Sequence, residues 1–276
     1  MAPINRLLLL FFSGSMAWVN ISGCTKKPVY IDEISSVVET RAAEFQFHPQ
    51  SNSDDPVVNH YGYTLQFSPE YNQPRWVAFH LDEKRLSGPY RSQPELIPDP
   101  LLDNLSPNPG WYRLRGYTPA PLVPAEFMQW SEKSHREPFY VSAITMQSRQ
   151  LNSGIWRLLR LHYAEWTGTF KDLYIINGPV LEPDLRRLPP GDVAVPQYIF
   201  SVILRTSPDS SCIGFLLPQE YLSTDLEKYI VPLDSIESLT AIDFLTLLPD
   251  SLETKWEATK NTQLWPMGIK KSHGGF

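Results

Sequence analysis

Cysteine and basic residues are both scarce in this chain. Its 276 residues include two cysteines, which is too few to define a disulfide framework. Lys and Arg number 24 against 30 Asp and Glu, for a formal net charge of -6 at pH 7. A protein that holds nucleic acid by bulk electrostatics concentrates Lys and Arg on one face. The balance therefore disfavours that class, although it leaves room for a local basic cleft.

The chain also begins without an apolar run long enough for a membrane span, which needs about 20 residues. Arg6 is instead followed by the short run 7–12, as in the charged start and apolar core of an export signal. Residues 21–24, Ile-Ser-Gly-Cys, resemble a bacterial lipobox, which implies cleavage before Cys24 and lipidation of its thiol. We therefore expect a protein anchored in the bacterial cell envelope, at the outer membrane. The alternative is an ordinary signal peptide with a chance cysteine. A lipidated Cys24 leaves Cys212 alone, as a small buried residue.

Composition changes along the chain predict four parts. Residues 1–23 are the signal peptide, and the polar residues 24–58 form a tether with a possible helix over 34–44. Residues 59–265 form the folded domain, and 266–276 a basic tail. Nine of the 26 prolines lie between residues 89 and 124, which predicts mostly irregular structure there.

Strands and helices are mixed within the domain. Alternating and short apolar runs predict strands over 63–67, 76–80, 139–142, 173–176, 198–204 and 212–217. Apolar residues at a period of 3.6 predict a helix over 151–166, with Asn152 as its N-cap. A second helix is predicted over 235–239. Because no regular alternation of strand and helix appears, an α+β fold is favoured over a doubly wound sheet.

Six segments, in this order, carry a resemblance to a known family: 74–81, 139–142, 151–156, 177–181, 193–196 and 236–244. The chain resembles the DNA/RNA non-specific endonucleases, the ββα-metal (His-Me finger) nucleases that include the endonuclease G type. The resemblance covers nearly all of residues 60–265. It implies a largely antiparallel sheet flanked by helices.

The resemblance also implies a chemistry that needs few residues. A divalent cation, usually Mg²⁺, is held by an asparagine at a helix start. A histidine in a D-R-G-H segment takes a proton from the attacking water, next to an arginine. A second asparagine, in an S-N-x-x-P-Q segment, supports the site. A glutamate two turns along the helix organises the metal's water shell.

Most of these positions are changed here. The D-R-G-H segment appears as residues 114–117, Leu-Arg-Gly-Tyr, so Arg115 is kept and Tyr117 replaces the histidine. Ala143 replaces the second asparagine and Arg160 the glutamate, while Asn152 stands at the metal position. A phenol has a reference pKa near 10, against about 6.5 for histidine, so it is a poor base at neutral pH. The resemblance thus implies a nuclease fold without its chemistry.

Each kept or changed residue has a simpler structural interpretation. Asn152 can be only a helix cap, and Tyr117 only a packed aromatic residue with a hydrogen-bonded hydroxyl. Arg115 can bind a phosphate or pair with an acid such as Asp103. Arg75 is structural or lies at the rim of the old cleft.

Three functions remain open. The first is a lipid-anchored, catalytically inactive protein that acts as an interaction or accessory subunit of an envelope assembly. It needs no cofactor and binds a protein partner, with nucleic acid disfavoured. The second is an active Mg²⁺-dependent nuclease or phosphodiesterase in which Tyr117 replaces the histidine and Asn152 holds the metal. The third is a binder of polyanions that does not cut, with one cleft lined by Arg75, Arg113, Arg115, Arg157 and Arg160.

Overall fold

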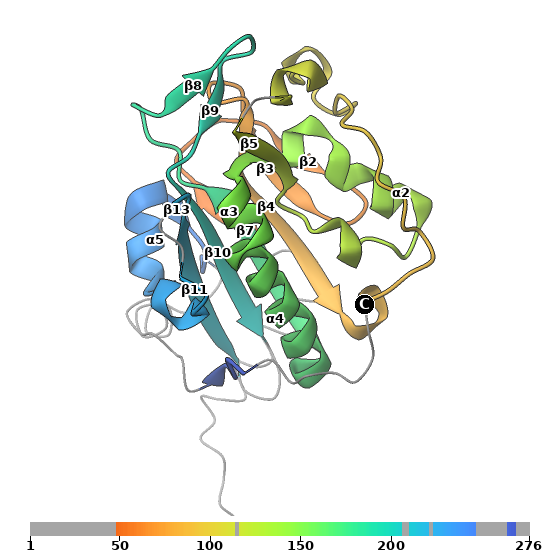
Figure 1. The fold of residues 1–276 in the computed structure, drawn as a ribbon, viewed down its shortest axis with the longest axis vertical. Coiled ribbons are helices and arrows are strands. Elements are labelled where there is room, and N and C mark those ends of the chain that lie inside the picture. The colour runs from red at the N-terminus through yellow and green to blue at the C-terminus, as the bar shows by residue number, and fades with distance from the viewer. Residues whose placement is uncertain (1–47, 114–115, 206–209, 221–222, 247–263, 269–276) are drawn as a thin grey trace, which may run out of the picture.

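The computed structural model describes residues 48–113, 116–205, 210–220, 223–246 and 264–268 (Figure 1). The predicted signal peptide, the lipidation site Cys24, the possible helix over 34–44 and Arg115 lie outside the described residues. No helix within the described ranges is both long enough and apolar enough to cross a bilayer.

A seven-stranded antiparallel sheet forms the centre of the fold (Figure 1). In spatial order its strands are β12 (Ile230–Val231), β11 (Ser211–Pro218), β10 (Tyr198–Arg205), β7 (Asp172–Pro179), β4 (Gln73–Asp82), β3 (Thr64–Ser68) and β2 (Val57–Asn59). The strands predicted over 63–67, 198–204 and 212–217 coincide with β3, β10 and β11 to within one residue, and those predicted over 76–80 and 173–176 lie inside the longer strands β4 and β7. The predicted α+β fold with a largely antiparallel sheet is confirmed.

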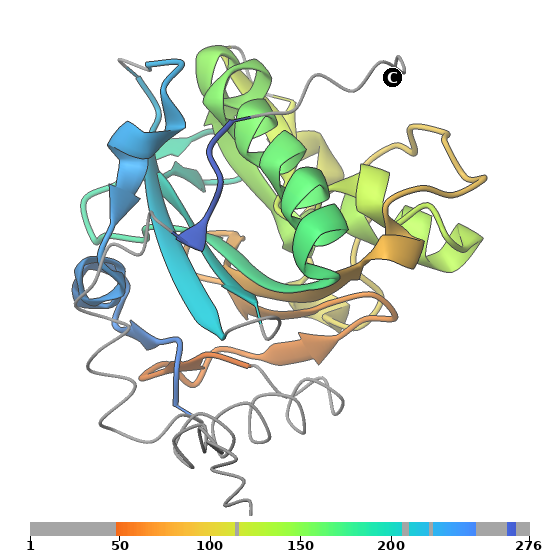
Figure 2. The same ribbon diagram turned by 90° about the horizontal axis from the view of Figure 1, so that it is seen from below.

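Each face of the sheet buries its own apolar cluster. Helix α4 (Ile155–Phe170) lies across one face, where its Trp156, Tyr163 and Trp166 pack among side chains of β3, β4, β7, β10 and β11. Helix α5 (Leu233–Thr240) packs against the other, with Leu233 and Ile236 beside Trp76 and Cys212. Figure 2 shows the two helices on different sides of the sheet. Cys212 is buried, as predicted.

The remaining elements are short. The pairs β5 (Tyr117–Pro121) with β6 (Ile144–Ser148), β8 (Arg186–Leu188) with β9 (Val193–Val195), and β1 (Gln50–Ser51) with β13 (Ile242–Asp243) form two-stranded sheets. Helices α2 (Glu132–Arg136) and α3 (Arg149–Ser153) are each one turn or little more. The loops between the strands and helices contain short 3-10 helices: η1 (Glu83–Arg85), η2 (Asp103–Leu105), η3 (Pro109–Tyr112), η4 (Ala125–Phe127), η5 (Glu137–Phe139), η6 (Val141–Ala143) and η7 (Leu226–Tyr229).

The predicted helix over 151–166 is two helices with a different cap. Ser148 is the N-cap of α3, and its hydroxyl accepts a hydrogen bond from the N–H of Leu151 at 3.1 Å. Gly154 then breaks the run and precedes α4, which has no side-chain cap. Asn152 lies inside α3, so its predicted role as N-cap is wrong. The apolar period continues through the break, which is why periodicity alone could not reveal it.

Two other predictions need correction. Residues 139–142 do not form a strand: Phe139 ends η5, Val141 and Ser142 belong to η6, and Tyr140 between them forms an isolated bridge with Ile97. The folded part of the chain also reaches into the segments predicted as tether (24–58) and tail (266–276). Strand β2 places the tether's last residues at the edge of the sheet, and Met267 packs against the core beside the fully buried Trp265.

Candidate functional site

Tyr117 begins β5, directly across from Ser148 on β6. Its ring is half-buried and packs on a small cluster that includes Tyr112, Met146 and Val193. No hydrogen bond joins its hydroxyl to another described residue. The structure therefore places Tyr117 as a packed aromatic residue, and the hydrogen-bond partner expected for its hydroxyl is not found among the described residues.

Ala143 lies in the core. It is 0% exposed, its carbonyl accepts a hydrogen bond from Leu122 N–H at 3.0 Å, and its methyl group belongs to the main apolar cluster. An asparagine amide at this position would have to enter that cluster. Two residues further, Thr145 donates to the Gln73 side chain at 2.6 Å, and Gln147 is fully buried with no hydrogen bond to either amide atom among the described residues.

Arg160 lies on α4 and forms an ion pair that the sequence did not predict. Its Nη1 atom lies 2.6 Å from the Glu126 Oε1 atom, which η4 supplies. Both side chains are partly exposed, at 23% for Arg160 and 42% for Glu126, whereas the Arg160 Nε is buried without a partner among the described residues. The guanidinium is thus held in place by a carboxylate from a neighbouring segment.

Asn152 does not belong to a group of metal-binding side chains among the described residues. It lies in α3, half-buried, and lines neither of the hollows described below. Across the described ranges, no group of three or more His, Cys, Asp or Glu side chains could hold a metal ion. Asn152, the residue at the family's metal position, is therefore not accompanied by such a group in the part of the chain that the structure describes.

Arg75 holds two parts of the fold together. Gln66 pairs with Trp76 and Phe67 with Pro74, so Arg75 occupies a β-bulge, where its Nε forms a 2.5 Å ion pair with Asp55.

Ser201, on β10, is buried. It hydrogen bonds at 2.7 Å to the Tyr163 hydroxyl, which also donates to the Asn177 Oδ1 atom at 3.0 Å. Burial raises the pKa of the Tyr163 phenol well above its usual value despite these bonds.

Two adjoining hollows border Tyr117. The larger, of about 880 Å³, is lined by Gly116, 148–150, Gly154, Ile155, Gln219, Glu220, Ser223 and Thr224. The second, of about 370 Å³, is lined by Tyr117, Arg186, 195–198 and 218–220. None of the four described arginines from the predicted basic cleft lines either hollow.

Gln219 fixes the wall that the two hollows share. Its Oε1 accepts from Ser148 N–H at 2.6 Å, its Nε2 donates to the Met146 carbonyl at 2.8 Å, and its own carbonyl accepts from the Ser148 hydroxyl. These bonds tie the end of β11 to β6 and to the start of α3. The sequence carried no signal for this role.

Two histidine clusters elsewhere resemble sites but cannot act as such. His60 Nε2 lies 2.9 Å from Asp99 Oδ2, and Ser142 donates to the same oxygen. A catalytic triad needs the histidine between the serine and the acid, so this order excludes that chemistry.

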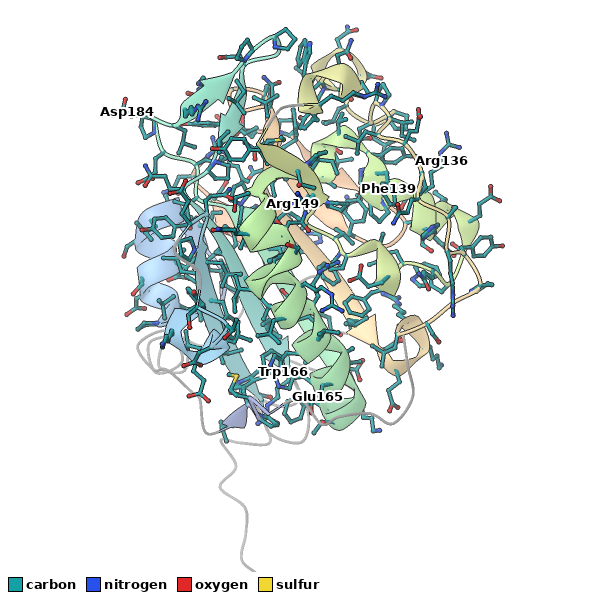
Figure 3. The ribbon with its side chains drawn as sticks, viewed as in Figure 1. Arg136, Phe139, Arg149, Glu165, Trp166 and Asp184 are labelled. Carbon is teal, nitrogen blue, oxygen red and sulfur yellow. The ribbon has the colours of Figure 1, made fainter. Side chains whose placement is uncertain are left out.

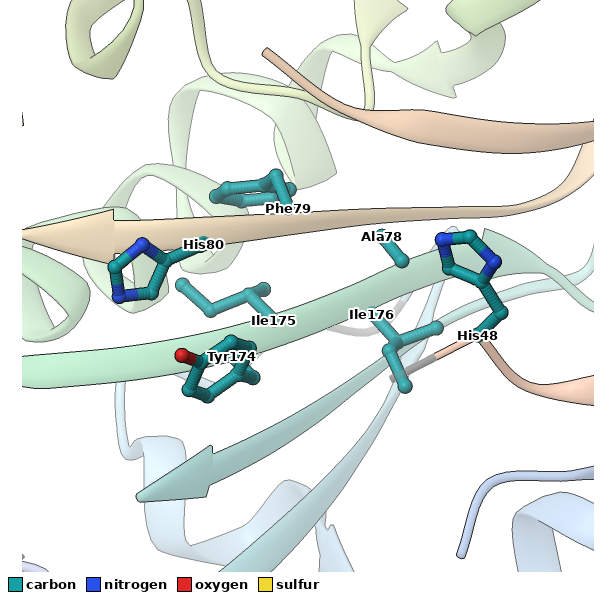
Figure 4. A pocket seen from close by; sticks show the side chains of 7 residues that line it. All are labelled: His48, Ala78, Phe79, His80, Tyr174, Ile175 and Ile176. Carbon is teal, nitrogen blue, oxygen red and sulfur yellow. The ribbon is translucent and has the colours of Figure 1, made fainter. Parts of the chain in front are cut away.

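On the face of the sheet opposite α4, His48, His80 and Tyr174 line a hollow of about 10 Å³ (Figure 4). That is room for about one water molecule.

Comparisons with known proteins agree with this architecture. Residues 41–251 match the family described as DNA/RNA non-specific endonuclease. The mitochondrial nuclease EXOG of Danio rerio is 27% identical over 218 residues, which cover 72% of this chain and 63% of the relative. A nuclease of Nostoc is 26% identical over 209 residues, covering 71% and 75%.

The chain therefore spans less than two thirds of the zebrafish relative. Among solved structures, the crystal structure of the EndoG/EndoGI complex has a chain that superposes with a TM-score of 0.68 at 22% identity, covering 86% of this chain and 97% of that one.

Proposed function

Because this chain belongs to the DNA/RNA non-specific endonuclease family, we propose that it keeps the family fold, lacks its hydrolytic chemistry, and acts as a lipid-anchored accessory subunit of a cell-envelope assembly. The observation that carries the loss of chemistry is the Arg160–Glu126 ion pair. A guanidinium stands where the family resemblance implies a carboxylate. A guanidinium has no oxygen to offer a cation or its water shell, and this one is already paired with Glu126.

The other substitutions support the same proposal. Mg²⁺ is bound through oxygen ligands, mainly carboxylates and water, and Asn152 alone supplies too few of them. Tyr117 offers a phenol where a base with a pKa near neutrality is needed. Ala143 presents only a methyl group to the core. The site residues that the structure describes thus do not fit a Mg²⁺ site.

An accessory role is supported by what the chain retains. The export signal and the Cys24 sequence point to a membrane anchor, and the scaffold is complete enough to match the family over residues 41–251. A protein of similar fold, EndoG, has been crystallised with EndoGI in a study of its inhibition. That complex supports the use of this fold as a surface for a protein partner.

The loss of chemistry is tested with the purified full-length chain, supercoiled plasmid, RNA, and Mg²⁺ or Mn²⁺. We expect no cleavage above that of the Tyr117→Phe variant, with an active family member as the positive control. Cleavage by the natural chain that Tyr117→Phe and Asn152→Ala each abolish would overturn the proposal. It would establish the alternative, a nuclease that uses Tyr117.

The accessory role is tested by extracting the protein from membranes in mild detergent. We expect it to migrate as part of a larger complex with a constant set of partners. Recovery of free monomer alone, under conditions that preserve other envelope complexes, would contradict the accessory role without bearing on the loss of chemistry.

A further inference from the structure

The two hollows adjoin each other and are taken together here as one surface. They share Gln219 and Glu220 in their common wall, and the consecutive residues Gly116 and Tyr117 line one hollow each. We call this surface the Tyr117 groove. It lies where β5 and α3 approach the ends of β10 and β11, and Figure 3 labels Arg149 there, at the start of α3.

Two arginines give the groove a charge opposite to that of the whole molecule. Arg149 lines the larger hollow and Arg186 the smaller. Both are exposed, and neither forms an ion pair with a described residue. Arg75, Arg160 and Arg187, by contrast, are each paired with an acid. In a chain of net charge -6, the described part of the groove therefore offers two guanidinium groups that no described acid pairs with.

The smaller hollow has a largely apolar and stiff wall, whereas polar side chains line most of the larger one. The smaller hollow is lined by the half-buried rings of Tyr117 and Tyr198, together with Pro196 and Pro218. Proline has a fixed backbone dihedral and a tyrosine ring few rotatable bonds, so such walls lose little entropy when covered. The three hydrogen bonds of Gln219 and Ser148 hold the wall that the two hollows share.

We propose that the Tyr117 groove binds an extended acidic segment of a partner protein, whose carboxylates pair with Arg149 and Arg186 while apolar side chains pack on Tyr117 and Tyr198. The inference rests on the proposed accessory function and names the surface that would serve it. Guanidinium groups bind carboxylates in a bidentate manner, and tyrosine and arginine are enriched where proteins bind each other.

Charge favours a polypeptide over nucleic acid as the occupant. Nucleic acid carries a charge at every phosphate, and its binding depends on several Lys and Arg contacts. The groove offers two arginines and also contains the acid Glu220, within a molecule of net charge -6. A peptide with a few spaced carboxylates can reach both arginines and leave apolar side chains beside Glu220.

The test measures binding to the full-length chain by fluorescence anisotropy. The probe is a labelled synthetic peptide in which Asp and Glu alternate with Leu and Phe. We expect the double variant Arg149→Glu/Arg186→Glu to bind at least tenfold more weakly, and Glu220→Gln to bind more tightly. Binding should weaken as salt is raised. Glutamate is tolerated in the first turn of a helix, so the change at position 149 should leave α3 intact.

Arg157→Glu is the matched control, because Arg157 is exposed on α4 and lines neither hollow. We expect it to bind the peptide like the natural chain. Equal binding by the double variant, or no binding by the natural chain at low salt, would overturn the inference.

Tighter binding of a labelled oligonucleotide than of the peptide at the same salt would also overturn it, in favour of nucleic acid. Cleavage in the plasmid assay would instead refute the proposed function, so the two failures are distinguishable.

Discussion

The ion pair between Arg160 and Glu126 should contribute to the stability of the fold, which can be measured without a substrate. Replacing Arg160 by Glu would set two carboxylates where an ion pair now lies at 2.6 Å. Because both groups are partly exposed, we expect Arg160→Glu to lower the free energy of unfolding by about 1 kcal/mol in urea titrations. The reciprocal double variant Glu126→Arg/Arg160→Glu should recover most of that loss. A double variant no more stable than the single one would show that the pair is not a specific contact.

The burial of His162 should make the free energy of unfolding depend on pH. His162 lies on α4 at 1% exposure, and burial lowers the pKa of its imidazole, with Glu165 opposing the shift. The unfolded chain therefore binds a proton more readily than the folded one, and stability is lost as pH falls below about 6.5, the ordinary histidine value.

We expect the free energy of unfolding to fall more between pH 7.5 and 5.5 in the natural chain than in His162→Gln. The pKa of His80 is also lowered, mainly by burial, but that residue is the same in both proteins, so the difference isolates His162. Parallel pH profiles for the two proteins would contradict this assignment.

The sequence predicted which residues of the family pattern are changed, but not what surrounds them. Tyr117, Ala143 and Arg160 could be read directly against the family pattern. Glu126 could not be matched to Arg160, because the pairing depends on how η4 approaches α4 across 34 residues of sequence. The bulge at Arg75 and the bonds of Gln219 were hidden for the same reason. Each depends on tertiary contacts rather than on local pattern.

Two glycines in different elements predict opposite effects of the same substitution. A Cβ atom on Gly178, in β7, would lie 2.3 Å from the Arg75 carbonyl oxygen and 2.4 Å from the Phe200 ring. Gly168 lies inside α4 with nothing within 4 Å of the same position.

We expect Gly178→Ala to destabilise the fold by about 1–3 kcal/mol through overpacking, and Gly168→Ala to stabilise it by up to about 1 kcal/mol through helix propensity. Thermal unfolding of both variants against the natural chain checks the pair. A neutral Gly178→Ala would mean that β4 and β10 are less closely packed on β7 than described.

Strands were predicted well and helix boundaries less well, for a physical reason. The strands of the central sheet are runs of Val, Ile, Leu and aromatic residues, and most of their residues are buried. Such composition identifies a strand whatever surrounds it. The segment 139–142 has the same composition but forms 3-10 turns, because its neighbours hold it: Val141 N–H donates to the Ile97 carbonyl at 3.0 Å, and Tyr140 N–H to that of Glu137 at 3.0 Å.

The molecule as a whole is an acidic domain that we propose to be held at a membrane by one lipid. Cys24→Ser removes the thiol that would carry it. We expect this variant to move from the membrane fraction to the soluble fraction with its thermal unfolding unchanged. Cys212→Ser, at a buried position of β11, is the matched cysteine control and should stay at the membrane. Continued membrane association of Cys24→Ser would refute the lipid anchor.

Manganese binding tests the loss of chemistry most directly, because the paramagnetic resonance signal of free Mn²⁺ disappears when the ion is bound. We predict that one equivalent of Mn²⁺ added to the natural chain keeps its full free-ion signal, as it does with Asn152→Ala. Stoichiometric loss of that signal in the natural chain, restored by Asn152→Ala, would contradict the account. It would mean that a cation binds beside Asn152 despite the Arg160–Glu126 pair.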